Sequence, residues 1–292
     1  FVIRLDGNPR LAMWCNVVSA IANIFFDWYM IVYMGWGLFG AAIASSLSMA
    51  IGGIIAVWYM CFAARQLRPI RLKWSCRSLL YSIRNIGYQC TIGMSALMGE
   101  CTMAVLALIG NYVFGAYLGD AGIGAFGIAC YYTPFVYMIG NAVAQSAQPI
   151  ISYNYGSGDS CRVRFTLRVA LLAAVVCGGS VSTAFVFFPY QLVELFINTN
   201  EAAFPLAVKG FPLMATAFVF FIVNLTLIGY YQSVERVRPA MVFALLRGIF
   251  FLVPCFLVLP LWFDETGIWI ALGMSEMLTT LCIIGYMWHS NR

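Results

Sequence analysis

Residues 204–231 read FPLAVKGFPLMATAFVFFIVNLTLIGYY and contain a single charged residue, Lys209. A helix of about 20 apolar residues crosses the ~30 Å hydrocarbon core of a bilayer, so this stretch predicts a transmembrane helix. Similar runs recur along the chain, near residues 11–32, 38–63, 87–117, 121–153, 165–188, 241–262 and 267–288. The sequence therefore predicts an all-α polytopic membrane protein with about eight transmembrane helices.

The composition supports the same class of protein and argues against several others. Of the 292 residues, 63% are hydrophobic and 9% are charged, whereas about a quarter of a soluble domain is charged. The net charge of +5 does not indicate a nucleic-acid partner, because the Lys and Arg residues lie in short loops rather than on one face. The ten cysteines have no paired CxxC spacing, and the one histidine, His289, lies in the tail. We therefore expect no metal site, no cofactor and no enzymatic activity.

Basic and acidic residues alternate between successive loops. Basic residues gather in the loops near 4–10, 65–84, 162–168 and 236–238 and at 292, and the intervening loops hold acids: Asp120, Glu194, Glu201, Asp264 and Glu265. Because Lys and Arg are retained on the cytoplasmic side, both ends of this chain are expected in the cytoplasm. Lys209 and Arg247 lie near helix ends, and we expect their side chains to extend to the membrane interface.

The longest charged connection, residues 64–86, is interpreted as a cytoplasmic linker that lies partly on the anionic lipid surface. It would join the last two helices of an N-terminal lobe, residues 1–63, to a six-helix C-terminal lobe, residues 87–292. A weak internal repeat agrees with two lobes: RLAM at 10–13 leads to GLFGA at 37–41, and RPAM at 238–241 leads to GIWIA at 267–271. The chain starts with Phe1 in a polar loop, so helices upstream are expected to be missing.

Two prolines interrupt the predicted helix 121–153. Pro134 and Pro149 each remove a backbone hydrogen bond from a helix, so we expect a bend or a break there. Breaks of this kind often mark a transport pathway.

Three carboxylates fall at membrane depth. A charged residue there costs roughly 2.5 kcal/mol or more, so each needs a partner, a water-filled cavity or protonation. Glu100 lies near the middle of helix 87–117 and is the best candidate to bind a proton or sodium ion reversibly; alternatively, it hydrogen bonds to Ser95 or Thr102 for packing. Asp27 shares a helical face with Asn23, either to attract a cation or to bridge helices. Glu276 is a further candidate in the last helix.

Several motifs resemble the multidrug and toxic compound extrusion (MATE) family: RLDGNPRLA at 4–12, NIFFD at 23–27, GWGLFGAAIA at 35–44 and QSAQPIISYNYG at 145–156. The resemblance implies helices five to twelve of a two-lobe, twelve-helix fold, with six-helix lobes that face each other across a central cavity. It also implies a secondary active transporter in a bacterial inner membrane, which exports drugs and organic cations by antiport with H⁺ or Na⁺.

The resemblance further implies roles for particular residues. Glu100 matches a cation-binding glutamate in the seventh helix of NorM-type members. Those members pair it with an aspartate in the tenth helix. The matching stretch of this chain, residues 216–230, contains no acid, and Tyr131 stands where their eighth helix has an asparagine. Proton coupling therefore gains weight against a complete sodium site. Aromatic side chains can stack on a cation, although such residues also serve as plain packing. The predicted substrate pathway combines two tyrosines with four polar residues: Tyr131, Tyr132, Asn224, Thr216, Glu276 and Gln148.

Two alternatives remain open. A flippase for lipid-linked oligosaccharides would share the fold, but the shortage of Arg and Lys residues for a pyrophosphate argues against it. A non-transporting truncated fragment would follow if the first lobe is incomplete. The partners expected from the sequence are organic cations or drugs and the lipid bilayer, with no nucleic acid, and the transporter is expected to be a monomer.

Overall fold

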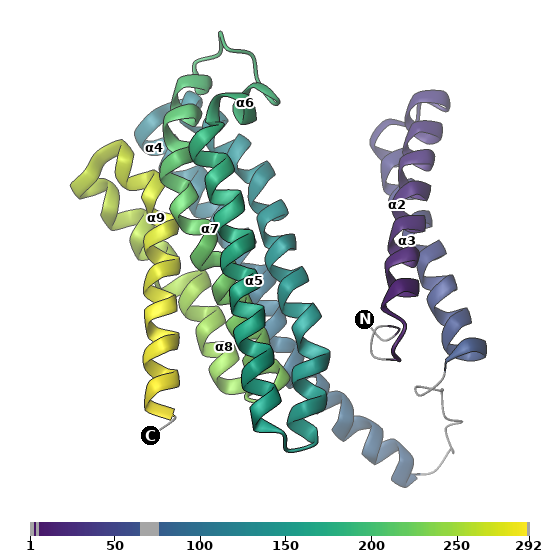
Figure 1. The fold of residues 1–292 in the computed structure, drawn as a ribbon. Coiled ribbons are helices and arrows are strands. Elements are labelled where there is room, and N and C mark those ends of the chain that lie inside the picture. The colour runs from purple at the N-terminus through teal and green to yellow at the C-terminus, as the bar shows by residue number, and fades with distance from the viewer. Residues whose placement is uncertain (1–2, 4–5, 65–75, 291–292) are drawn as a thin grey trace. The chain divides into compact units, whose positions relative to one another are not determined.

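The computed structural model describes residue 3 and residues 6–64 and 76–290, and the regular structure in these residues is helical. The chain divides into two compact units, Phe1–Tyr81 and Ser82–Arg292, each of which is described by itself (Figure 1). The division falls inside the segment 64–86 interpreted above as a linker. Residues 65–75 of that segment, with most of its basic side chains, lie outside the described residues.

Unit 1 is a pair of helices that each end in a π-helical turn. α2 (Pro9–Asp27) continues into η1 (Trp28–Tyr33), and α3 (Gly37–Trp58) continues into η2 (Tyr59–Ala63). The two helices approach closely through small residues: Ala44 and Ser48 are buried, and a Cβ atom on Gly52 would overlap the Ser19 hydroxyl. Small residues every four positions allow this close packing of membrane helices.

Unit 2 consists of α4 (Cys76–Gly156), α5 (Ser160–Phe187), the short α6 (Pro189–Glu194), α7 (Ala203–Ser233), α8 (Val237–Leu245), η3 (Leu246–Phe250) and α9 (Leu252–Ser290). α4 and α9 each contain one residue outside the helical conformation, Gly119 (φ 62°, ψ −154°) and Asp264 (φ 46°, ψ −130°).

The chain reverses at both of these residues. The rings of Phe114 and Phe126 stack at 4.7 Å on either side of Gly119, whereas residues twelve apart in one straight helix would be separated by about 18 Å. Gly267 likewise lies against the carbonyl group of Leu259, across Asp264. α4 and α9 are therefore hairpins of two helices each.

The described residues contain six helical stretches that are long and apolar enough to cross a membrane. Two of them, Ala96–Gly156 and Val237–His289, have 61 and 53 residues, far more than the ~20 needed for one crossing. Because each contains one of the reversals, each crosses twice, which brings the crossings to eight. The predicted number of transmembrane helices is confirmed.

The predicted start of one helix is wrong, because α4 begins at Cys76 rather than near residue 87 and the end of the predicted linker is helical. Of the bend or break predicted at Pro134 and Pro149, the break is absent, since α4 leaves the helical conformation only at Gly119. Proline is tolerated inside membrane helices because neighbouring groups satisfy the backbone atoms that it frees. The positive φ angle at the break, in contrast, is readily adopted by glycine, because glycine has no Cβ atom.

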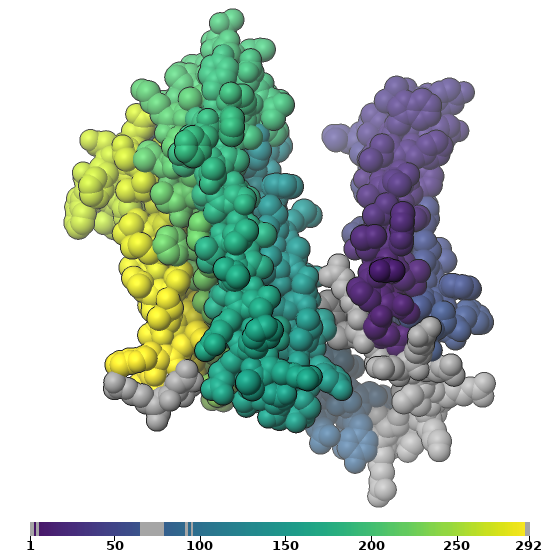
Figure 2. All heavy atoms as spheres, viewed as in Figure 1, coloured from purple at the N-terminus to yellow at the C-terminus, as the bar shows by residue number. Residues whose placement is uncertain are grey.

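The core of unit 2 is rich in aromatic side chains, and α7 lies at its centre, between α5 and α9 (Figure 1). Phe114 meets Trp269 edge to face at 4.8 Å, and Phe185 meets Phe218 in the same way at 4.8 Å. Gly210 leaves room for the Trp269 ring, which occupies the place of a Cβ atom. Figure 2 shows that side chains fill the spaces between the helices of unit 2 on the face in view.

Candidate functional site

The most deeply buried charges in unit 2 form an ion pair. Arg247 in η3 donates from Nε to Oε1 of Glu276 in α9 at 2.6 Å, and each side chain is 1% exposed. Asn224 of α7 donates from Nδ2 to the other carboxylate oxygen at 2.7 Å, and Thr280 donates to Oδ1 of Asn224 at 2.8 Å. We call these four residues the buried charge network. It joins three membrane-crossing segments, and Asn224 also donates to the backbone carbonyl of Glu276 at 2.9 Å.

The guanidinium group of Arg247 is only partly satisfied. Its Nη1 and Nη2 atoms are buried without a hydrogen-bond partner in the described part of the chain. Instead, the guanidinium lies 4.0 Å above the ring centre of Phe221, a cation–π contact that compensates some of the lost hydration. The network therefore holds one negative and one positive charge, and it carries no net charge inside the bundle.

The expectation that the Arg247 side chain extends to the membrane interface is wrong. A buried arginine is tolerated here because Glu276 supplies an opposite charge at hydrogen-bond distance. The π-helical turn of η3 also widens the helix at this residue, and π-turns often occur at functional sites. The sequence does carry a signal for this pair, because Arg247 falls within the apolar run 241–262 and Glu276 within the next run, 267–288.

Glu100 has a different environment. It is exposed, and its Oε1 accepts a hydrogen bond of 2.7 Å from the phenol of Tyr137. Tyr137 lies near the middle of the second half of α4, so Glu100 is opposite the middle of a membrane-crossing helix. The suggested partner Thr102 bonds instead to the Met98 carbonyl of its own helix, and the side chain of Ser95 lies outside the described residues.

Glu100 lies close to the buried charge network. The Tyr137 ring meets the Phe221 ring edge to face at 6.3 Å, and Phe221 in turn carries the Arg247 guanidinium. Gly248, next to Arg247, packs directly against Thr102, which lies two residues after Glu100. An accessible carboxylate and a neutralised one therefore lie in neighbouring parts of unit 2.

Asp27 belongs to unit 1, at the end of α2. Its Oδ1 atom and the Nδ2 atom of Asn23 are both buried and have no hydrogen-bond partner among the described residues. A bare carboxylate oxygen in an apolar environment is costly, so a proton or a cation would stabilise it. Asp27 and Glu100 lie in separate units.

The other residues predicted on the substrate pathway are scattered over unit 2. The structure unites Asn224 and Glu276 in the buried charge network. The Tyr132 phenol donates to the Leu192 carbonyl at 2.9 Å, and Tyr131 stacks on Phe196 at 5.3 Å and is 69% exposed. Thr216 is exposed and bonds within its own helix, and Gln148 donates to Gln232 at 3.1 Å. These four contacts do not belong to the network.

Eight membrane crossings, with an ion pair buried among those of unit 2, define a polytopic helical membrane protein. The MatE family model matches residues 96–257, just over half of the chain, and the chain belongs to this family. The resemblance to the MATE family described from the motifs is thereby confirmed.

Individual relatives agree with this assignment. The chain is 24% identical to the multidrug export protein MepA of Staphylococcus saprophyticus over 291 residues, covering 97% of this chain and 60% of that protein. It is 26% identical to a probable multidrug resistance protein NorM of Rhizobium meliloti, covering 93% and 60%. The chain therefore spans about 60% of the length of the curated relatives that it matches.

Solved structures share the fold. The Vibrio cholerae MATE transporter VcmN superposes with a TM-score of 0.84 at 18% identity, covering 97% of this chain and 62% of that one. An outward-facing multidrug resistance MATE transporter of the MOP superfamily gives a TM-score of 0.82 at 17% identity, covering 94% and 60%.

Proposed function

We propose that the protein exports drugs and other organic cations across a bacterial inner membrane by antiport with H⁺ or Na⁺. The family and the names of relatives such as the multidrug export protein MepA support this proposal. Because the chain spans about 60% of those relatives, the activity is proposed for the complete protein. Both ends of the chain would be cytoplasmic, and the transporter would act as a monomer.

The observation that carries the proposal is the environment of Glu100. Its carboxylate is exposed beside the middle of a membrane helix, and it accepts one hydrogen bond from a neutral phenol. No salt bridge joins it to a basic residue in the described ranges. Such a carboxylate can exchange a proton or a metal cation with water, as coupling requires.

Glu276 is unsuited to this role in the conformation described, because Arg247 already supplies its counter-charge. Asp27 is the second candidate, since its Oδ1 atom is buried and unpartnered within the described residues. For the organic cation, Tyr131 offers an exposed aromatic face that is held by stacking on Phe196. The buried, paired Arg247 does not favour the flippase alternative, which needs accessible basic residues.

The test is gradient-driven export by the complete protein in proteoliposomes or everted vesicles. With a cationic dye on the cytoplasmic side of the protein and an imposed proton or sodium gradient, the wild type is expected to move the dye against its concentration gradient. Glu100→Gln removes the exchangeable charge and is expected to abolish coupled export, and Asp27→Asn is expected to reduce it. The gradient that drives the wild type identifies the coupling ion.

Glu201→Gln is the matched control, because it removes one exposed acid in the connection between α6 and α7, outside the bundle. It should export like the wild type. Full activity of Glu100→Gln would remove the coupling role from this residue. If neither gradient drives export by the wild type, the transport proposal itself fails.

A further inference from the structure

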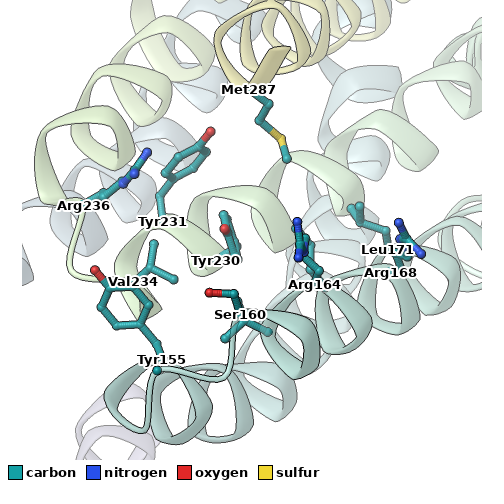
Figure 3. Close-up of a pocket in the computed structure, with 13 residues that line it drawn as sticks. Tyr155, Ser160, Arg164, Arg168, Leu171, Tyr230, Tyr231, Val234, Arg236 and Met287 are labelled. Atoms are coloured by element: carbon teal, nitrogen blue, oxygen red, sulfur yellow. The ribbon is translucent and has the colours of Figure 1, made fainter. Parts of the chain in front are cut away.

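A pocket of about 540 Å³ opens at the end of unit 2 where α4 meets α5 (Figure 3). It lies between the first three turns of α5, the end of α7 and Met287 near the end of α9. Its lining includes neither Glu100 nor any residue of the buried charge network. The pocket is therefore separate from the coupling site proposed above.

The polar part of the pocket is positively charged. Arg164, Arg168 and Arg236 line it, and no acid is among the 13 lining residues in the described chain. The nearest acids along the chain are engaged elsewhere: Asp159 pairs with Arg162, and Glu235 accepts a hydrogen bond from Tyr88. Within the described ranges, no salt bridge neutralises Arg164 or Arg168.

Hydroxyl groups also line the pocket. Figure 3 shows Tyr155 and Ser160 beside the turn between α4 and α5, with Tyr230 and Tyr231 on α7. Arginine forks bind the oxygens of a phosphate group in pairs, and hydroxyl groups donate to the oxygens that remain. The site is thus suited to a phosphate group.

The remaining lining is apolar and continues toward the membrane core. Leu167 and Leu171 extend the pocket along α5, to about 16 Å from Ser160 on the helix axis. The membrane-length stretches of α5 and α7 begin at Ser160 and end at Ser233, so Arg236 follows one stretch and Arg164 and Arg168 lie within about the first 12 Å of the other. A ligand with a charged head and an apolar tail matches both parts.

We propose that this pocket binds the headgroup of an anionic phospholipid from the leaflet at the basic end of unit 2. Basic pockets between membrane helices are known to hold such headgroups. A free phosphate or nucleotide would use the arginines but would leave the apolar extension unfilled. The proposal depends on the membrane location of the helices and not on the transport function.

The test is native mass spectrometry of the complete protein in detergent, titrated with dioleoyl-phosphatidylglycerol or dioleoyl-phosphatidylcholine. The wild type is expected to bind the first lipid at least about tenfold more tightly, because both lipids carry a phosphodiester but the choline group of the second adds a positive charge beside the arginines. Arg164→Gln/Arg168→Gln should remove that preference. Equal affinity of the wild type for both lipids would overturn the proposal.

The control is Arg238→Gln, compared with Arg168→Gln alone, because it removes one exposed positive charge from the same end of unit 2 and leaves both the pocket and the Arg162–Asp159 pair intact. It should keep the preference, and loss of the preference here would point to a general charge effect and against the pocket. If inorganic phosphate at millimolar concentration displaces the lipid, the site belongs to a soluble anion and the lipid assignment is wrong. Should the double pocket variant not fold, Arg168→Gln alone provides the same comparison.

Discussion

Arg247 and Glu276 carry opposite charges in a part of unit 2 that water does not reach. Their attraction is strong at low dielectric, but burying both charges costs nearly as much, so the net stabilisation by such a pair is small. Breaking the pair is another matter, because the remaining charge is then buried alone. The pair therefore acts mainly to fix the packing of η3 against α9.

Arg247→Met should lower the free energy of unfolding by about 3–5 kcal/mol, because the Glu276 carboxylate is left buried without its counter-charge. Arg247→Met/Glu276→Gln should recover part of that loss, since the amide is neutral and can still accept from Asn224. Unfolding in detergent micelles, followed by circular dichroism, measures both. A double variant no more stable than the single one would contradict this account.

At the level of residues, the sequence identified the acids better than their partners. The sequence singles out Glu276 and Asn224, but it places Arg247 at the interface and does not pair Tyr137 with Glu100. Hydropathy locates a residue along one helix but does not show which helix lies opposite. Tyr137 and Glu100 meet across a reversal, 37 residues apart.

The helices themselves were predictable because each crossing needs its own apolar run. The ends of the helices were harder to predict. α4, for example, starts within a charged segment whose low hydropathy indicates a loop. The π-turns η1, η2 and η3 could not be anticipated from periodicity, which assumes a regular helix. The prolines did not mark the break in α4, which lies at Gly119 instead.

Gly119→Ala tests the importance of this reversal. The backbone at φ 62° and ψ −154° lies in a region that is accessible almost only to glycine, so alanine should cost about 1–3 kcal/mol of stability. Gly127→Ala is the matched control, because Gly127 is helical and has open space around its Cα atom. That variant should be neutral or stabilised by up to about 1 kcal/mol. Equal effects on thermal unfolding would exclude a special role for Gly119.

On the scale of the whole molecule, the loop charges separate to opposite ends of unit 2. The α4–α5 turn and the end of α9 lie at one end, and α6 lies at the other (Figure 1). Arg162, Arg164 and Arg168 follow that turn, whereas Glu194 closes α6 and Glu201 follows it. The alternation of basic and acidic loops in the sequence thus corresponds to the two ends of unit 2. Successive loops lie at opposite ends of the bundle, so the sequence alone predicts this separation of charge.

Cys161 is an exposed free thiol at the basic end, so it reports the orientation directly. With a membrane-impermeant maleimide, we expect Cys161 to react in inside-out vesicles and to be protected in intact cells. Asn198→Cys, in the exposed connection after α6, should show the reverse. Peptide mapping by mass spectrometry separates these sites from the other cysteines. Labelling of Cys161 in intact cells would invert the proposed topology.

The buried ion pair also bears on how the protein is made. An arginine passing alone from the translocon into lipid would cost roughly 2.5–3.5 kcal/mol. Glu276 follows Arg247 by 29 residues, beyond the reversal at Asp264, and so leaves the ribosome shortly afterwards. The hairpin from α8 through α9 can then enter the bilayer as one unit with its charges already paired. The short interval between the synthesis of Arg247 and that of Glu276 therefore lowers the cost of inserting this segment.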